Sequence, residues 1–137
     1  MVRLKLDQDS LGLSSLIERM TNSKVKDCFG DDENFYIIVP RGEMGRILGK
    51  NGSTIKKVQA KLAKKVKVIE YKDNVIDFVR AVIYPVRVEE IIEEEGIIYI
   101  KDSQKKTKSL LIGREGRTLK LISRAVQRFF NVELKVV

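Results

Sequence analysis

The sequence predicts an α+β protein made of two small units in tandem, each a three-stranded sheet covered by helices. Two observations lead to this fold class. A Gly-x-x-Gly tetrapeptide occurs twice, beginning at Gly49 and again at Gly113, 64 residues later. Around this repeat, the 137 residues divide into the same order of helical and extended patterns. We therefore place the units at residues 1–72 and 73–137.

In the first unit, the spacing of apolar residues predicts three helices and three strands. Residues 13, 16, 17 and 20 keep helical spacing, and the run Phe-Tyr-Ile-Ile-Val is a dense stretch of β-formers. The predicted elements are a helix capped by Ser10, strands at residues 24–29 and 35–39, a short helix at 43–48, a helix capped by Ser53, and a strand at 66–71.

The second unit repeats this order with almost no linker after residue 72. Its first helix has a cap candidate at one end and a proline at the other, and proline cannot continue a helix. The predicted elements are a helix from Asn74 that Pro85 ends, strands at residues 86–94 and 97–101, helices at 106–112 and 117–130, and a strand at 132–137.

Positive charge is concentrated in the same two places as the repeat. The chain carries 27 Lys and Arg against 19 Asp and Glu, for a formal net charge of +8. Nine basic residues lie between Arg41 and Lys67 with one acid among them, and nine lie between Lys101 and Arg128 with two. A solvated basic surface would explain the excess alone, but its placement around the glycines favours a phosphate-bearing partner.

A glycine turn between two helices suits a nucleic-acid backbone. Glycine has no Cβ, so it permits both a tight turn and a close approach of the ligand. The free N–H groups at the start of the next helix favour a phosphate, and Lys50 and Arg114 add charge at the turn. Any helix-turn-helix can use glycines at its turn, so one copy is a weak signal. Two copies in matching basic surroundings are a strong one.

The segment Arg-Ile-Leu-Gly-Lys-Asn-Gly-Ser-Thr-Ile, residues 46–55, resembles the signature of KH domains. The order of elements with a leading helix resembles the type II, prokaryotic form of that fold. Two abutting units, the second with Leu-Ile-Gly-Arg-Glu-Gly-Arg at residues 111–117, resemble the paired KH region of NusA-type transcription factors. The compact chain is similar to the stand-alone archaeal members of that family, which are assigned to transcription termination.

The resemblance implies that each unit captures about four single-stranded RNA nucleotides, with the backbone on the loop and the bases on an apolar groove. The implied RNA-binding residues are Gly49, Lys50, Asn51 and Gly52 with Arg46, Ile47, Ile55, Lys56 and Lys57 in the first unit, and Gly113, Arg114, Glu115, Gly116, Arg117 and Lys120 in the second. The apolar residues at these positions fit a core role equally well. Glu115 places an acid in the second loop, so we expect weaker binding there.

Catalysis is not expected. The chain has no histidine, which removes the commonest general base and metal ligand, and we expect no cofactor and no metal. The single cysteine, Cys28, is expected to be a structural thiol. No run of apolar residues is long enough to span a membrane, and the N-terminus has no apolar signal-peptide core. With a single cysteine, these features favour a cytoplasmic location, and we expect a monomer.

Three functions remain open at this point. The first is a NusA-type RNA-binding transcription factor acting on the nascent transcript, with RNA polymerase as a second partner. The second is a KH protein of ribosomal or other structured RNA. The third is a protein-interaction module that docks on polymerase and has lost RNA binding. The placement of charge favours the first two, and the tandem arrangement favours the first.

Overall fold

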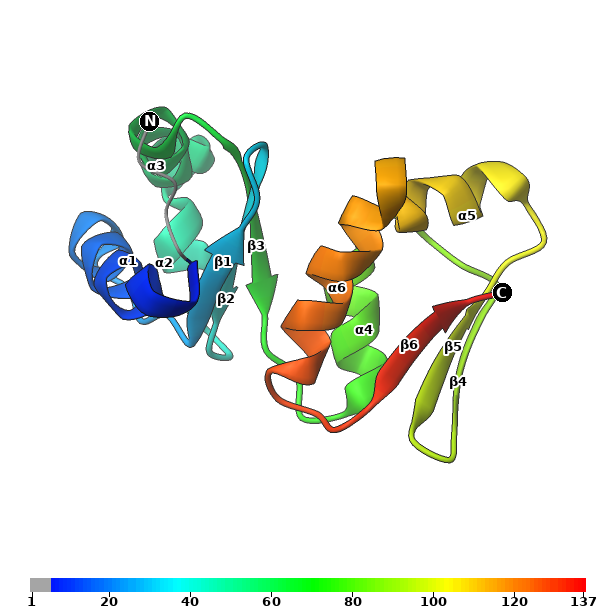
Figure 1. Cartoon of the computed structure of the whole chain (residues 1–137). Coiled ribbons are helices and arrows are strands. Elements are labelled where there is room, and N and C mark those ends of the chain that lie inside the picture. Colours follow the sequence, from blue (N-terminus) through cyan, green and yellow to red (C-terminus); the bar gives the residue numbers. More distant parts are fainter. Residues whose placement is uncertain (1–5) are drawn as a thin grey trace. The chain divides into compact units, whose positions relative to one another are not determined.

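The computed structural model describes the backbone of residues 6–137 and the side chains from residue 12 onward. The chain separates after Tyr71 into two units, the second running from Lys72 to Val137 (Figure 1). The first contains α1 (Leu6–Thr21), β1 (Asp27–Gly30), β2 (Asn34–Val39), α2 (Met44–Leu48), the 3-10 turn η1 (Lys50–Gly52), α3 (Ser53–Leu62) and β3 (Lys65–Glu70). The second contains α4 (Val75–Ile83), β4 (Glu90–Glu94), β5 (Ile97–Lys101), α5 (Lys105–Ile112), the 3-10 turn η2 (Arg114–Gly116), α6 (Arg117–Gln127) and β6 (Glu133–Val136).

Each unit holds one mixed three-stranded sheet. In the first, the order is β1-β2-β3, with β2 antiparallel to β1 and parallel to β3. The second has the order β4-β5-β6 and the same strand directions. Parallel neighbours need a crossover connection, which the two helices and the glycine turn supply in each unit. The predicted α+β class with two three-stranded sheets is confirmed, and each glycine turn lies within a crossover.

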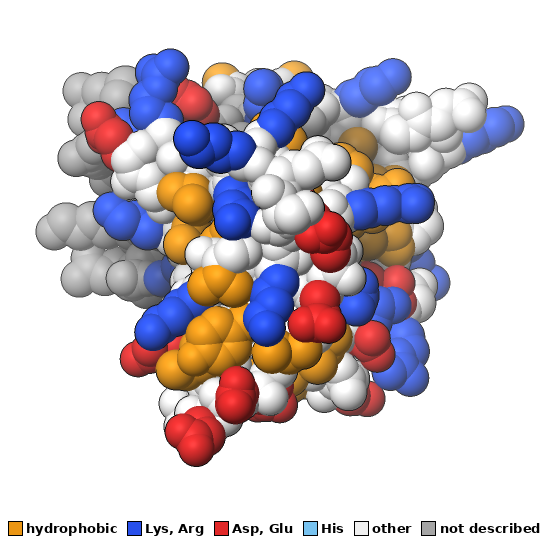
Figure 2. All heavy atoms as spheres, turned by 90° about the vertical axis from the view of Figure 1, so that its right-hand side faces the viewer, with side chains coloured by type: hydrophobic (Ala, Val, Ile, Leu, Met, Phe, Trp, Pro, Cys, Tyr) orange, Lys and Arg blue, Asp and Glu red, His pale blue; other side chains and the backbone are white. Residues whose placement is uncertain are grey.

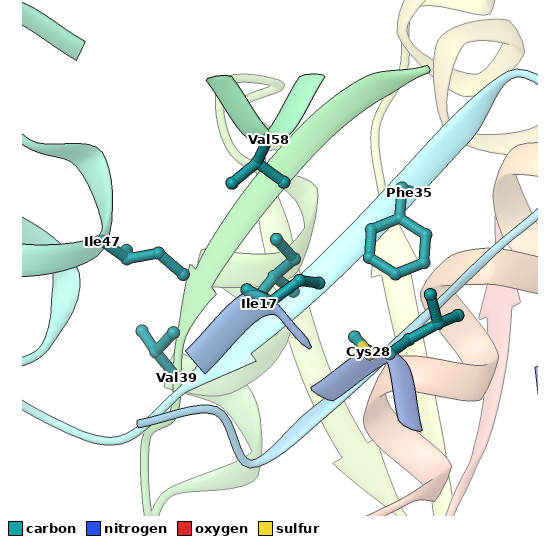
Figure 3. Packing of buried hydrophobic residues seen from close by; sticks show 8 residues of the cluster. Ile17, Cys28, Phe35, Val39, Ile47 and Val58 are labelled. Carbon is teal, nitrogen blue, oxygen red and sulfur yellow. The ribbon is translucent and has the colours of Figure 1, made fainter. Parts of the chain in front are cut away.

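The core of the first unit lies between its sheet and its helices. Buried side chains from α1, β1, β2, α2 and α3 meet there. Figure 3 shows how these residues lie around one another: Ile17, Cys28, Phe35, Val39, Ile47 and Val58. The Cys28 thiol is fully buried, 3.2 Å from the Ser14 hydroxyl, which fits the expected structural role.

In the second unit, α4 and α6 pack side by side and run in opposite directions (Figure 1). The ring of Phe78, in the first turn of α4, lies 5.7 Å from the ring of Phe129 and 5.8 Å from that of Phe130, both just after α6. The start of α4 is therefore at the end of α6. It follows that α4 runs toward the end of the unit where α6 begins.

Of the three helix caps predicted from the sequence, the structure confirms one and contradicts two. Asn74 caps α4 as predicted, since its side chain accepts hydrogen bonds from the N–H groups of Ile76 and Asp77 at 2.9 and 3.1 Å. Ser53 is not a cap: it is the first residue of α3, and Gly52 in a left-handed conformation occupies the cap position. Ser10 lies inside α1, which already includes Leu6, so the predicted cap there is wrong as well.

The strand predicted at residues 86–94 is shorter in the structure, because β4 begins only at Glu90. The preceding residue, Glu89, is held by side chains instead. Its N–H donates to the Asp102 carboxylate at 3.1 Å, and its own carboxylate accepts from the N–H of Ser103 at 2.6 Å. This non-local contact holds Glu89 outside the sheet, and β4 begins at the next residue. Within the described residues, no helix is long and apolar enough to cross a membrane.

A half-buried lysine makes the stability of the first unit depend on pH. The Lys67 ammonium on β3 lies 5.5 Å from the centre of the Tyr36 ring. Burial lowers the pKa of Lys67 from 10.5 to about 8. The folded state therefore releases a proton at lower pH than the unfolded state does. Burial, and then the charge of Asp31, raises the pKa of Tyr36, so that group opposes the effect only above about pH 10.

We expect Lys67 to contribute a rise in the free energy of unfolding from about pH 8 to 10, because in this range the unfolded chain keeps the proton that the folded Lys67 has lost. Lys67→Met should remove the rise, since no ammonium is then buried. The matched control is Lys65→Met, at an exposed position of the same strand, which should keep it. Urea unfolding at pH 7.5 and 9.5 measures the difference. Equal pH dependence in the wild type and Lys67→Met would refute this assignment.

Candidate nucleic-acid interface

The two glycine turns have the same backbone conformation. The first glycine has φ 75° and ψ 176° at Gly49, and φ 75° and ψ 174° at Gly113. Side chains other than hydrogen are essentially excluded from this region of φ and ψ. The third position is left-handed in both turns, with φ 56° at Asn51 and φ 57° at Glu115. The repeat seen in the sequence is therefore a repeat of one loop structure.

A threonine five positions later explains why the first glycine lacks a side chain. A Cβ on Gly49 would overlap Thr54 Oγ1 and lie 2.7 Å from Thr54 Cβ. A Cβ on Gly113 would meet Thr118 in the same way, with its Cβ at 2.8 Å. Sequence reasoning missed these threonines, although Gly-x-x-Gly-x-Thr occurs in both copies. In each loop, the threonine occupies the space that a side chain on the first glycine would need.

Each loop opens a helix whose first turn has no side-chain cap. Gly52 and Gly116 occupy the cap positions of α3 and α6, with φ 73° and 76°, and neither helix has an acid in its first turn. By contrast, Asn74 caps α4. The first N–H groups of a helix lack intrahelical acceptors and lie at the positive end of its dipole. The starts of α3 and α6 are therefore suited to an anion.

The structure brings most of the expected charged side chains to the surface around these loops. Arg46 lies in α2 with its exposed guanidinium 4.0 Å from the carboxylate of Glu43, whose side chain is half-buried. The exposed residues at and beside the two loops are Arg46, Lys50, Asn51, Lys56 and Lys57 in the first unit, and Arg114, Glu115, Arg117 and Lys120 in the second.

The apolar residues divide between core and surface. Ile47 is fully buried, so it belongs to the core and offers no surface to a base; Leu111, its counterpart, is 1% exposed. The helix spacing could not separate these two roles. Ile55 is half-buried and packs against the core, so one side of it still reaches the surface beside the loop. Ile47 is thereby removed from the set of contact residues.

The surroundings of the second loop are more apolar than those of the first. Leu110, 56% exposed, stands where the first unit has Arg46, and Ile112 is 37% exposed. Together with Glu115 in the loop, this leaves the second unit with less positive charge directly at its glycines.

Figure 2 shows acidic side chains at the lower end of the face it views, where Figure 1 places the β4–β5 turn. The acids of that turn are thus at the other end of the unit from the loop.

Among residues 12–137, no three side chains of the metal-binding types come together, so the described side chains offer no metal centre. What the loops share is a ligand chemistry: main-chain N–H groups, a conformation that keeps side chains away, and cations around them. That combination binds phosphate groups.

A family model described as "KH domain" matches residues 14–95, which is more than half of the chain and includes the first loop. The chain belongs to the KH-domain family, and its relatives place it among the archaeal NusA-like proteins. It is 30% identical over 122 residues to a protein of Methanococcus vannielii, covering 86% of this chain and 70% of that one. It is 27% identical over 134 residues to a protein of Halococcus morrhuae, covering 96% of each. Both carry the name "Probable transcription termination protein NusA".

Further comparisons agree over the whole length of the chain. A protein of Methanocaldococcus jannaschii with the same name is 25% identical over 142 aligned positions, covering 100% of this chain and 77% of that one. The solved structure titled "Crystal structure of APE1850" superposes with a TM-score of 0.71 at 26% identity, covering 95% of this chain and 97% of that one. Both units are therefore part of what the relatives share.

Proposed function

We propose that this chain is a NusA-type transcription factor that holds single-stranded RNA on its two glycine loops. In this proposal residues 1–72 and 73–137 are two KH domains of the type II form. The observation that carries it is the repeated loop: Gly49 and Gly113 have the same backbone conformation, and each loop opens an uncapped helix among exposed cations. The names of the relatives, which are transcription termination proteins, support an action on the nascent transcript during termination, and we extend the proposal to elongation.

The mechanism follows from what lies at each loop. The sugar-phosphate backbone lies across the glycines, where no side chain keeps it away from the main-chain N–H groups. Lys50 and Arg114 contribute charge in the loops, and Lys56 and Lys120 contribute it on the following helices. The bases lie toward the half-buried apolar side chains beside the loop, such as Ile55. No bond is made or broken, and we assign no catalytic role.

Titration of wild-type protein with a single-stranded RNA of about twelve nucleotides tests the proposal. Because affinity comes mainly from phosphate contacts, the logarithm of the binding constant should fall linearly with the logarithm of salt concentration. Three or more contacts give a slope of about −2 or steeper for a single strand. No detectable binding at low salt would refute RNA binding. Capture of RNA polymerase from a native extract supports the transcription role, whereas capture of ribosomes alone would favour ribosomal RNA as the target.

Replacement of the acid in the second loop should strengthen RNA binding. Glu115 is left-handed, as Asn51 is in the first loop, and its carboxylate repels the phosphate that the loop would hold. We expect Glu115→Asn to raise affinity about fivefold at low salt, the effect of removing roughly 1 kcal/mol of repulsion. Asn51→Glu should lower affinity by a similar factor. Fluorescence anisotropy with labelled RNA measures both.

Glu95 offers a matched control for this substitution. It is exposed and left-handed too, with φ 50°, but it lies in the β4–β5 turn. Glu95→Asn makes the same change of charge and relieves the same left-handed backbone strain. Because this turn lies away from the glycine loop, the substitution should leave RNA affinity unchanged. An equal gain in both variants would show that net charge alone, and not the second loop, sets the affinity.

A further inference from the structure

The second unit has a cavity that the glycine loops do not use. It has a volume of about 290 Å³ and lies at the connection between α4 and β4. Its lining within the described part of the chain consists of Arg80, Ile83, Tyr84, Val86, Arg87 and Val88. The chain thus provides a ring, three aliphatic side chains and two guanidinium groups at one place.

Tyr84 is unusual among the aromatic residues of the described chain. Its side chain is 64% exposed, whereas the other tyrosines and the phenylalanines are buried or half-buried. Beside it, Ile83 is 3% exposed and forms an apolar floor, and Arg80 and Arg87 are both exposed. An open aromatic ring next to arginine is the arrangement on which unpaired bases stack in single-strand binders.

The cavity lies toward the end of the unit that carries the second loop. Because α4 and α6 pack together and are antiparallel, α4 runs toward the end of the unit where α6 begins and where Gly116 holds the cap position. Counted from the Phe78–Phe129 contact at about 1.5 Å per residue, Ile83 lies about 8 Å and Arg117 about 18 Å toward that end. Tyr84 follows the last turn of α4 directly. Along the helix axes the ring is therefore about 10 Å from the loop, a distance that a few nucleotides span.

We propose that this cavity binds one unpaired base of the same RNA strand that the second loop holds. The inference rests on the proposed function and adds a contact to it. The 64-residue offset places Met20, half-buried in α1, where the second unit has Tyr84, so the first unit has no such ring. The unit whose loop carries Glu115 is thus the one with an additional base site. Stacking there offsets the weaker phosphate contact, because a tethered base binds at a high effective concentration.

A tryptophan reporter tests the site directly, since the chain has no tryptophan of its own. Tyr84→Trp should lose fluorescence on addition of a twelve-nucleotide single-stranded RNA, with the same midpoint as anisotropy of the labelled strand. Tyr99→Trp is the matched control: Tyr99 is half-buried in β5, paired with Ile92 and Lys135, and its fluorescence should not change. An abasic strand of the same length should leave Trp at position 84 unquenched.

Affinity measurements on the full chain complete the test. Tyr84→Ala should weaken binding of the twelve-nucleotide RNA about tenfold, within the range for loss of one stacked base, and Tyr84→Phe should keep it. If RNA binds by anisotropy but the tryptophan signal stays constant, this inference is overturned and the proposed function stands. If no RNA binds at all, both fail. Quenching by a glutamate-rich peptide and not by RNA would overturn the base site in favour of a protein partner.

Discussion

Replacing Lys50 and Asn51 together by aspartate should cost roughly 10- to 100-fold in affinity for single-stranded RNA and leave the fold intact. Hydrogen bonds to charged groups contribute about 1.5–3 kcal/mol each. Two carboxylates in the loop would repel the phosphate that accepts these hydrogen bonds. Both side chains are exposed, so their replacement leaves no buried group unsatisfied. Anisotropy titrations at two salt concentrations measure the loss, and circular dichroism verifies the fold.

The chain contains a close control for this double variant. Asn22 is left-handed with φ 52°, as Asn51 is with φ 56°, and Lys24 is exposed as Lys50 is. Asn22→Asp with Lys24→Asp makes the same change of charge in the turn between α1 and β1. It should lower affinity only slightly. If the two double variants lose the same affinity, the first loop has no special part in binding.

The corresponding change in the second unit should have a smaller effect. Arg114→Asp removes the cation of a loop that already contains Glu115 and is flanked by the exposed Leu110. We therefore expect a smaller loss of RNA affinity than the double replacement of Lys50 and Asn51 causes. A larger loss than in the first loop would reverse the proposed ranking of the two units.

Gly49→Ala should destabilise the protein by about 3 kcal/mol. A residue with a Cβ is strained at φ 75° and ψ 176°, at a cost of about 1–3 kcal/mol, and the new Cβ would overlap Thr54, which adds to it. Gly113→Ala should behave alike, because Thr118 stands in the same relation to it. Urea unfolding measures the change in the free energy of unfolding.

Two neighbouring glycines separate the causes of this loss. At Gly52 an added Cβ meets nothing closer than 4.0 Å, so Gly52→Ala should cost only the left-handed strain, about 1–2 kcal/mol. Gly45 lies inside α2 with nothing within 4 Å of an added Cβ, so Gly45→Ala should stabilise by up to about 1 kcal/mol. If Gly49→Ala proves as stable as Gly45→Ala, the described loop conformation is wrong.

The sequence predicted features that depend on neighbouring residues. Asn74 as a cap and the paired glycine turns follow from short-range geometry, and both sheets follow from local β-forming runs. The cap at Ser53 failed for a related reason, because a left-handed Gly52 already ends the loop and begins the helix. Features of this kind can be read from a window of a few residues.

Features that depend on contacts between distant residues could not be predicted. The start of β4 is set by the bond from Glu89 to Asp102, thirteen positions away. The same limit applies to Ile47: its helical spacing fits a groove or a core, and only the packing of α2 against α1, α3 and β3 decides for the core. The exposure of the Tyr84 ring likewise depends on tertiary packing, because no distant segment of the described chain covers it.

In the proposed complex, the main-chain amides of both glycine turns hold the phosphates of a single strand. Backbone NMR spectra of the wild-type protein, recorded as RNA is added, test this most directly. We expect the largest amide shifts at Lys50, Asn51 and Gly52 and at Arg114, Glu115 and Gly116. If saturating RNA leaves the resonances of these six amides unshifted and shifts those of α1 or the β4–β5 turn instead, the proposed contact is contradicted.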